Sequence, residues 1–310
     1  MRKILLWGLM VAMSSVLFTN CTNEDWVPQE PSDNIGGDGG STTPGTDKDV
    51  PFEVAATLPA TKTIVSGDEL KWATGDRMNV FHTVSSTTAF VNDDAVELED
   101  AEKGLFKGTL AKSLKKGYTY DWYAFYPYTE GLTLVGNAAE VTIGAAVGDV
   151  QTQAGYNSNA HLAGNAMPLY GYATGVEAND TPALAMNHLT TVIEVIITNG
   201  VTPPLTINEV TVTVGEEIVG SFNLDLASGE FSAANASKTA TLEVTGATEV
   251  ASGETASFYI AAKPFTAIPA DEIKVTVNGY EKIVKLEAVT EFKAGEKAVI
   301  EATYDKVDFD

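Results

Sequence analysis

Short segments in which apolar and polar residues alternate fill the chain from Pro51 onward. The period of two is clearest at residues 210–214, 240–244 and 273–277, where aliphatic side chains alternate with threonine, glutamate or lysine. This period turns one face of a β-strand toward a core and the other toward solvent. The pattern therefore predicts an all-β protein made of short, half-buried strands.

Turn signals separate these segments, and helical spacing is scarce. The dipeptide Asn278-Gly279 stands between two strand-like runs, and both residues tolerate the positive φ that tight hairpin turns require. Residues 107–117 could form at most a turn or two of helix. About 260 residues of short strands are more than one sandwich needs, so we expect two β-sandwich domains, residues 51–182 and 183–310.

The aromatic segment YTYDWYAFYPY, residues 118–128, has two possible interpretations. In an extended strand its aromatic side chains divide into two faces, with Tyr118, Tyr120, Trp122 and Tyr126 on one and Tyr123 and Phe125 on the other. The rings could form a platform on which sugars stack. We favour a central strand packed on both faces, with tyrosine hydroxyl groups reaching a wet edge.

The N-terminus has the layout of a secretory signal. Arg2 and Lys3 precede a mostly apolar run, residues 4–18, which is shorter than the about 20 residues of a membrane helix. Cys21 is the only cysteine, so it cannot form an internal disulfide. We expect residues 1–20 to be a lipoprotein signal peptide and Cys21 to carry fatty acids such as palmitate. The alternative is a spare cysteine in a discarded leader.

Residues 21–50 are predicted to be a flexible tether. They are rich in glycine, proline, serine, threonine and aspartate and contain almost nothing to bury. As a random coil, a segment of this length spans roughly 30 Å on average. The GGDGG run at residues 36–40 does not predict a phosphate loop, because no strand precedes it and no helix follows.

The charge excludes one class of partner. Removing the signal leaves 17 basic residues against 42 acidic ones, a formal charge of −25. A chain this acidic repels nucleic acid, so we expect no nucleic-acid partner. The same charge favours solubility, so any assembly must be specific.

Candidate catalytic and metal-binding residues form no local pattern. The three histidines, His82, His161 and His188, are far apart in the sequence and have no cysteine nearby, unlike the ligands of a zinc site. No GxSxG serine motif is present. Forty-two acids make any chosen carboxylate pair uninformative. We therefore expect no enzyme activity, metal or cofactor.

Five ordered segments together resemble the Bacteroidales fimbrillin family of type V pilus subunits. They are residues 61–81, 120–128, 161–175, 184–199 and 292–304. The resemblance implies a lipoprotein precursor with two transthyretin-like β-sandwich domains. It also implies a structural role, in which the chain contacts other fimbrial subunits and supports cell adhesion. Glu24 and Asp25 resemble the acidic export signal of Bacteroidetes lipoproteins, which implies the surface of the cell outer membrane.

The resemblance further implies assembly by donor-strand exchange. In the family, a trypsin-like protease cuts after a basic residue near the first strand, and a neighbour's strand fills the vacated groove. The matching segment here is residues 51–59, with Phe52, Val54 and Ala56 on one face. Lys62 stands where the family often has arginine, so the alternatives are a lysine-tolerant protease acting there, cleavage at Lys48, or no processing.

The position of this subunit in a fimbria stays open between stalk, tip and accessory roles. The last strand-like run, residues 297–304, is followed only by DKVDFD, whereas stalk subunits of the family carry extra terminal strands. The main alternative function is a cell-surface glycan-binding lipoprotein, which depends on the aromatic segment. The sequence identifies no host protein or glycan ligand.

Overall fold

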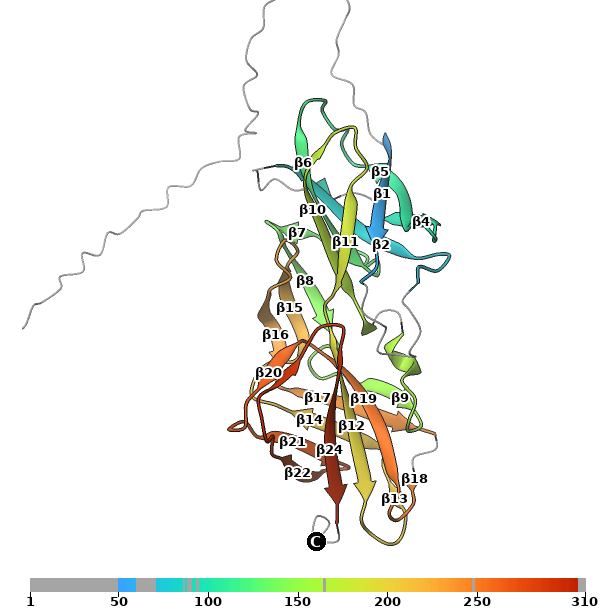
Figure 1. Cartoon of the computed structure of the whole chain (residues 1–310), viewed down its shortest axis with the longest axis vertical. Helices are drawn as coiled ribbons and strands as arrows, with labels where there is room; N and C mark the ends of the chain where they lie inside the picture. Colours follow the sequence, from blue (N-terminus) through green and yellow to red (C-terminus); the bar gives the residue numbers. More distant parts are fainter. Residues whose placement is uncertain are drawn as a thin grey trace, which may run out of the picture. The chain divides into compact units, whose positions relative to one another are not determined.

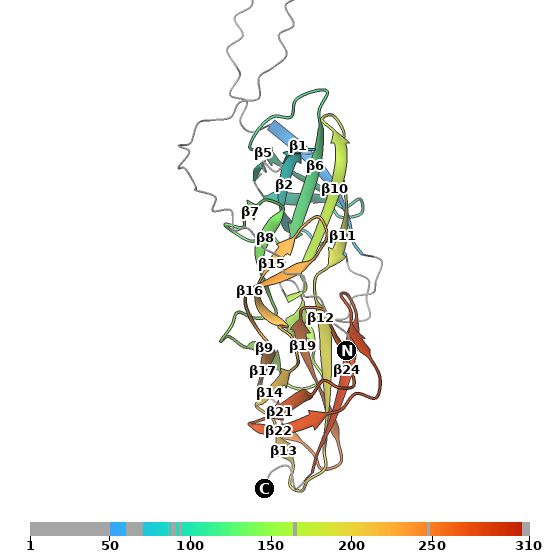
Figure 2. The same cartoon turned by 90° about the vertical axis from the view of Figure 1, so that its left-hand side faces the viewer.

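The computed structural model describes residues 50–59, 71–85, 87, 91–92, 95–163, 166–246 and 249–305. Strands make up nearly all of the regular structure in these ranges, and the helical part is limited to short 3-10 segments such as η1 (Ala160–Leu162). The expectation of an all-β fold is confirmed (Figures 1 and 2). No helix in the described part is long and apolar enough to span a membrane.

The largest sheet has eight strands and closes on itself. Its order is β3 (Val91–Asn92), β2 (Arg77–Val84), β4 (Val96–Asp100), β5 (Leu105–Leu110), β1 (Val50–Thr57), β11 (Ala183–His188), β10 (Leu169–Glu177) and β6 (Thr119–Tyr126). β6 also pairs with β2 over six residue pairs, from Asn79↔Phe125 to Val84↔Tyr120. The hydrogen-bonded ladder therefore returns to β2, and β1 is an interior member of this closed sheet.

Two further sheets lie mostly in the second half of the chain. One has the order β22 (Tyr280–Val284), β21 (Ile273–Val277), β14 (Glu209–Thr213), β17 (Thr239–Thr245) and β9 (Gln151–Ala154). The other has the order β19 (Thr255–Ala262), β12 (Thr191–Asn199) and β24 (Lys297–Tyr304). β24 runs parallel to β12 for eight pairs, and the two lie side by side in Figure 1.

The remaining strands form one four-stranded sheet and two short pairs. The sheet has the order β16 (Phe231–Ser237), β15 (Val219–Asp225), β8 (Ala138–Ile143) and β7 (Leu134–Val135). The pairs are β13 (Leu205–Thr206) with β18 (Glu249–Val250), and β20 (Phe265–Ala267) with β23 (Thr290–Phe292). β8 and β9 thus pair with strands much later in the chain, and β11 belongs to the closed sheet. The domain boundaries and the transthyretin-like arrangement stay predictions.

The alternation in the sequence corresponds to burial. At β14, Val210 and Val212 are fully buried, while the threonines beside them are half-buried. One core cluster is built from residues of β12 and later elements. A second fills the closed sheet, and a third joins Phe81, Tyr123 and Phe125 to residues of β8 and β15.

Local predictions had mixed outcomes. The hairpin is confirmed, since β21 and β22 pair across Asn278 and Gly279, whose φ angles are 49° and 89°. The two faces of the aromatic segment are also confirmed, because Tyr120 and Trp122 lie in one core cluster and Tyr123 and Phe125 in another. The helical turn at residues 107–117 is wrong. Lys107 to Leu110 belong to β5 instead, where they pair with β1.

Candidate functional site

β1 is the first described strand, and it is inserted between two strands from distant parts of the sequence. It pairs antiparallel with β5 over six residues, from Val50↔Leu110 to Ala55↔Leu105. On its other side it pairs parallel with β11 over three residues only, from Ala55↔Ala183 to Thr57↔Ala185. The first half of β1, residues 50–54, therefore has one edge without a partner strand in the described part.

The inward face of β1 packs into the core of the closed sheet. Val54 and Ala56 are 0% and 2% exposed, and Phe52 is half-buried against the same cluster. The Phe52 ring stacks on Trp122 with 5.4 Å between ring centroids and 25° between planes. The expectation that Phe52, Val54 and Ala56 share a face agrees with this packing. Their exchange between subunits stays a prediction.

Two glycines, one just before β5 and one within it, allow β1 to pack closely against this part of the chain. A Cβ on Gly104 would collide with the carbonyl oxygen of Ala56, and Gly104 also has a φ of 60°. A Cβ on Gly108 would lie 3.3 Å from the Phe52 ring. In addition, the indole Nε1 of Trp72 donates a buried hydrogen bond of 3.0 Å to the Ala56 carbonyl. These contacts fix the far end of β1 by its backbone.

A small ion-pair network joins β1 to its neighbours. Lys107 Nζ lies 3.3 Å from Glu53 Oε1 on β1 and 2.6 Å from Glu99 Oε2 on β4. The hydrogen bonds to Glu99 and then to Glu53 raise the pKa of the Lys107 ammonium above its ordinary value. All three side chains are about half exposed, so the network contributes little to stability but can discriminate between charges.

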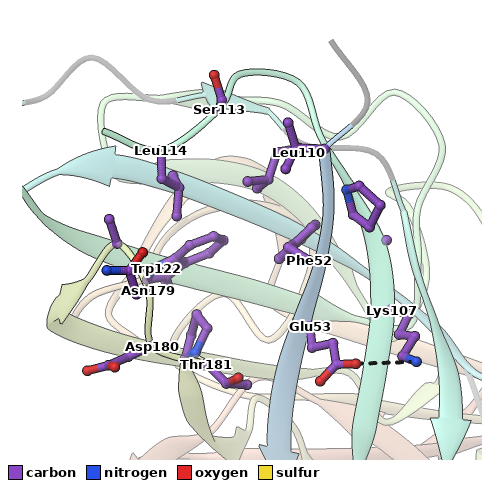
Figure 3. A pocket seen from close by; sticks show the side chains of 15 residues that line it. Phe52, Glu53, Lys107, Leu110, Ser113, Leu114, Trp122, Asn179, Asp180 and Thr181 are labelled. Carbon is purple, nitrogen blue, oxygen red and sulfur yellow. Dashed lines mark ion pairs between the residues drawn. The ribbon is translucent and has the colours of Figure 1, made fainter. Parts of the chain in front are cut away.

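A cavity of about 480 Å³ borders the unpartnered edge of β1. Figure 3 shows its lining side chains, which include Phe52 and Glu53 on β1, Lys107 and Leu110 on β5, Leu114 after β5, Trp122 on β6, and residues 178–182 between β10 and β11. Pro51 also lines it and has no backbone N–H to leave unpaired at such an edge. Trp122 lies at the base of this cavity, so β1 does not fill the space available to it.

We call this surface the β1 seat and define it as Gly104, Lys107, Gly108, Trp122 and the β11 residues 183–185. Its hydrophobic floor continues into the core cluster of the closed sheet. The buried Nε1 of Trp122 has no hydrogen-bond partner among the described residues. The seat can therefore hold an extended strand by backbone pairing, by one aromatic contact and by one charged contact.

The other predicted site residues have different outcomes. Cys21, Lys48 and Lys62 lie outside the described residues. The sequence reasoning missed Lys71, an exposed residue that also precedes β2 and could be cut by a trypsin-like protease. An isolated lysine beside the buried Trp72 gives no periodic signal that could have identified it.

Trp122 is not available as a surface platform for sugars. Its exposed fraction is 1%, and its ring lies between Phe52 and His82, with 5.0 Å separating the His82 and Trp122 centroids. The packed-strand interpretation of the aromatic segment is confirmed. The described residues contain no group of three or more His, Cys, Asp or Glu side chains that could hold a metal ion.

His188 is a buried histidine at the end of β11, three residues beyond the part of that strand that belongs to the β1 seat. It is 8% exposed, and neither ring nitrogen has a hydrogen-bond partner among the described residues. A Cβ on Gly295 would lie 2.5 Å from its ring, so the ring packs directly on that glycine. Burial lowers the pKa of His188, because the charged imidazolium would lose its hydration. Burial likewise lowers the pKa of His161, although its Nε2 lies 3.0 Å from the Tyr259 carbonyl.

Comparisons with known proteins identify one family and several solved structures that resemble this chain. A family model described as fimbrillin-like matches residues 61–308, and no curated protein matches the chain. A solved Bacteroides ovatus protein with a proposed role in cell adhesion has a TM-score of 0.50 at 17% identity, with 83% of this chain and 93% of that chain covered. A second B. ovatus structure, of an adhesin candidate, has a TM-score of 0.50 at 9% identity, covering 84% and 90%. At these identities the two structures support the fold alone.

Proposed function

Since the chain belongs to the fimbrillin-like family, we propose that it is a structural, non-enzymatic subunit of a surface fimbria that supports cell adhesion. We propose further that subunits join by donor-strand exchange at the β1 seat. The proposal covers a stalk, tip or accessory subunit, and its partners are other fimbrial subunits. Its localisation is the fimbria and, before processing, the cell outer membrane.

The position of β1 in the chain carries this proposal. β1 is interior to the closed sheet, yet it is the first strand among the described residues, so it can leave without any other strand of that sheet threading past it. Lys62 and Lys71 lie between β1 and β2, and Lys48 lies before β1. Cleavage at Lys62 or Lys71 would separate β1 from the body. Cleavage at Lys48 would remove the tether and leave β1 attached.

The imperfect fit of β1 supports replacement by another strand. The cavity beside residues 50–54 leaves room that bulkier side chains could fill, with a gain of roughly 25 cal/mol per Å² of apolar surface buried. The Trp122 Nε1 has no hydrogen-bond partner among the described residues while β1 is in place. A neighbour's strand that fills the cavity would bind more favourably than β1 once the covalent link is cut.

Export as a lipoprotein completes the proposal. Acylation at Cys21 would hold the precursor at the outer membrane, since two or three acyl chains anchor firmly where one does not. The residues from 22 to 49 would act as a spacer between the lipid and β1. Cleavage beyond β1 would release the subunit from the anchor and empty the seat in one step.

Mass spectrometry of fimbriae and membranes from producing cells tests the proposal. We expect the subunit in fimbriae to start at Thr63 or Trp72, and the membrane-bound precursor to start at an acylated Cys21. Lys62→Gln and Lys71→Gln variants, alone and together, identify the cut, with Lys48→Gln as the matched control. Recovery of acylated full-length monomer alone would contradict the exchange mechanism.

A further inference from the structure

We infer that the β1 seat selects its occupant by side-chain order. The preferred occupant is an extended segment of another fimbrial subunit in which an aromatic residue is followed by an acid, then a β-branched residue, and a small residue two positions later. These positions correspond to Phe52, Glu53, Val54 and Ala56. The inference rests on the proposed function and specifies which partner strand that site accepts.

The aromatic position is set by Trp122 and Gly108. The Phe52 ring stacks on Trp122 and lies over Gly108, where a Cβ would press on both the ring and, at 2.7 Å, on Val96. Offset stacking favours an aromatic ring over an aliphatic side chain of similar area. Trp122 is itself backed by His82, so the surface that receives the ring is held in place.

The acidic position is set by Lys107. Glu53 and Lys107 are direct cross-strand partners, and Lys107 is the only basic residue among the described residues that line the cavity. Opposite charges that face each other across strands attract, and like charges repel. Glu99 neutralises part of the Lys107 charge, so we expect this position to reject a basic residue more clearly than it distinguishes acidic from neutral ones.

The β-branched and small positions are set by burial and close packing. Val54 is fully buried opposite Phe106, where a β-branched residue fits the pleated surface. Ala56 is 2% exposed, and Gly104 and Trp72 both contact its carbonyl oxygen. A longer side chain at this position would have no open space to enter. The occupant is thus specified at four positions, 52, 53, 54 and 56, each by a different set of contacting residues.

Peptide binding to the trypsin-treated full chain tests this selectivity. The labelled probe has the sequence of β1, VPFEVAAT, and fluorescence anisotropy measures its affinity. Variant probes carry Phe52→Ala, Glu53→Lys or Ala56→Leu, and an Ala55→Ser probe is the matched control. The uncut chain, whose seat is occupied, is the control for binding elsewhere.

We expect the Phe52→Ala and Ala56→Leu probes to bind at least about tenfold more weakly, a change equivalent to about 1.4 kcal/mol. The Glu53→Lys probe should lose about threefold at low salt and regain it at high salt, because the pair is partly exposed. The Ala55→Ser probe should bind like the parent. A Lys107→Glu chain should reverse the preference between the glutamate and lysine probes, which separates charge recognition from a general loss of folding.

The outcomes distinguish the selectivity of the β1 seat from strand exchange itself. Equal affinities for all probes would overturn the selectivity and leave strand exchange standing. No binding of any probe to the cut chain, or equal binding to the uncut chain, would overturn both, because no exchangeable seat would then exist.

Discussion

Phe52 and Trp122 show at the scale of single residues what the sequence could and could not indicate. The alternation of the aromatic segment correctly placed Trp122 on an inward face. Its contact with Phe52 could not be predicted, because the two residues are far apart in sequence and no local period relates them. The same holds for Lys107, which its own segment suggested to be helical and which instead pairs with Glu53.

Truncating Val54 should destabilise the protein. Val54→Ala removes fully buried methyl groups from the core of the closed sheet, so we expect the free energy of unfolding to fall by about 2 kcal/mol. Val135→Ala is the matched control, because Val135 is 83% exposed and its loss should change stability by less than about 0.5 kcal/mol. Urea denaturation measures both. Equal effects would show that β1 is not packed as described.

His188 should make stability depend on pH. Burial lowers its pKa in the folded state, so the unfolded chain binds the proton more readily. The stability contributed by the neutral ring is fully present above the ordinary histidine pKa of about 6.5 and is lost as pH falls below it, by at most about 1.4 kcal/mol per pH unit. Urea denaturation between pH 8 and pH 5 measures this loss.

The matched variant for this pH dependence is His188→Leu. The leucine cannot take up a proton, so the stability of this variant should fall less between pH 8 and pH 5. His161 is half-buried and should supply part of the remaining dependence. An unchanged pH profile in His188→Leu would contradict the account.

At the scale of elements, strands with local signals were predictable and their partners were not. The period of two located β14, β17 and β21, and the Asn278-Gly279 turn specified the β21–β22 hairpin. No such signal exists for the parallel pairing of β1 with β11, because it joins residues 55–57 to 183–185 without any short connection. Backbone hydrogen bonds between distant strands depend on the whole fold.

The hairpin turn should require a glycine. Gly279 has a φ of 89°, and a Cβ added there would have no heavy atom within 4 Å beyond its chain neighbours, so Gly279→Ala tests backbone strain alone. We expect a loss of about 1–2 kcal/mol in the free energy of unfolding. Gly215→Ala is the matched control, since Gly215 has ordinary φ and its nearest neighbour is 3.9 Å away. Equal stability of the two variants in urea would contradict the turn geometry.

In the molecule as a whole, β1 differs from the other strands of the closed sheet in how it is connected to the rest of the chain. Every other strand of that sheet is connected to the body on both sides, whereas β1 is connected to the described body only through the segment that contains Lys62 and Lys71. The sequence predicted the all-β class from alternation and composition. Closure of the sheet through β2 and β6 could not be predicted, since it depends on how many strands pair and in which order.

A reversible disulfide that holds β1 to β5 tests strand exchange most directly. Glu53 and Lys107 are direct partners in an antiparallel pair, so Glu53→Cys and Lys107→Cys should form a disulfide between β1 and β5. A Cys21→Ser background leaves no other thiol. After trypsin treatment, electron microscopy should show filaments from the reduced protein and none from the oxidised protein. An absence of filaments from both forms would contradict a stalk role. Filaments from the oxidised protein would contradict the account that β1 leaves its seat so that a neighbour's strand can enter.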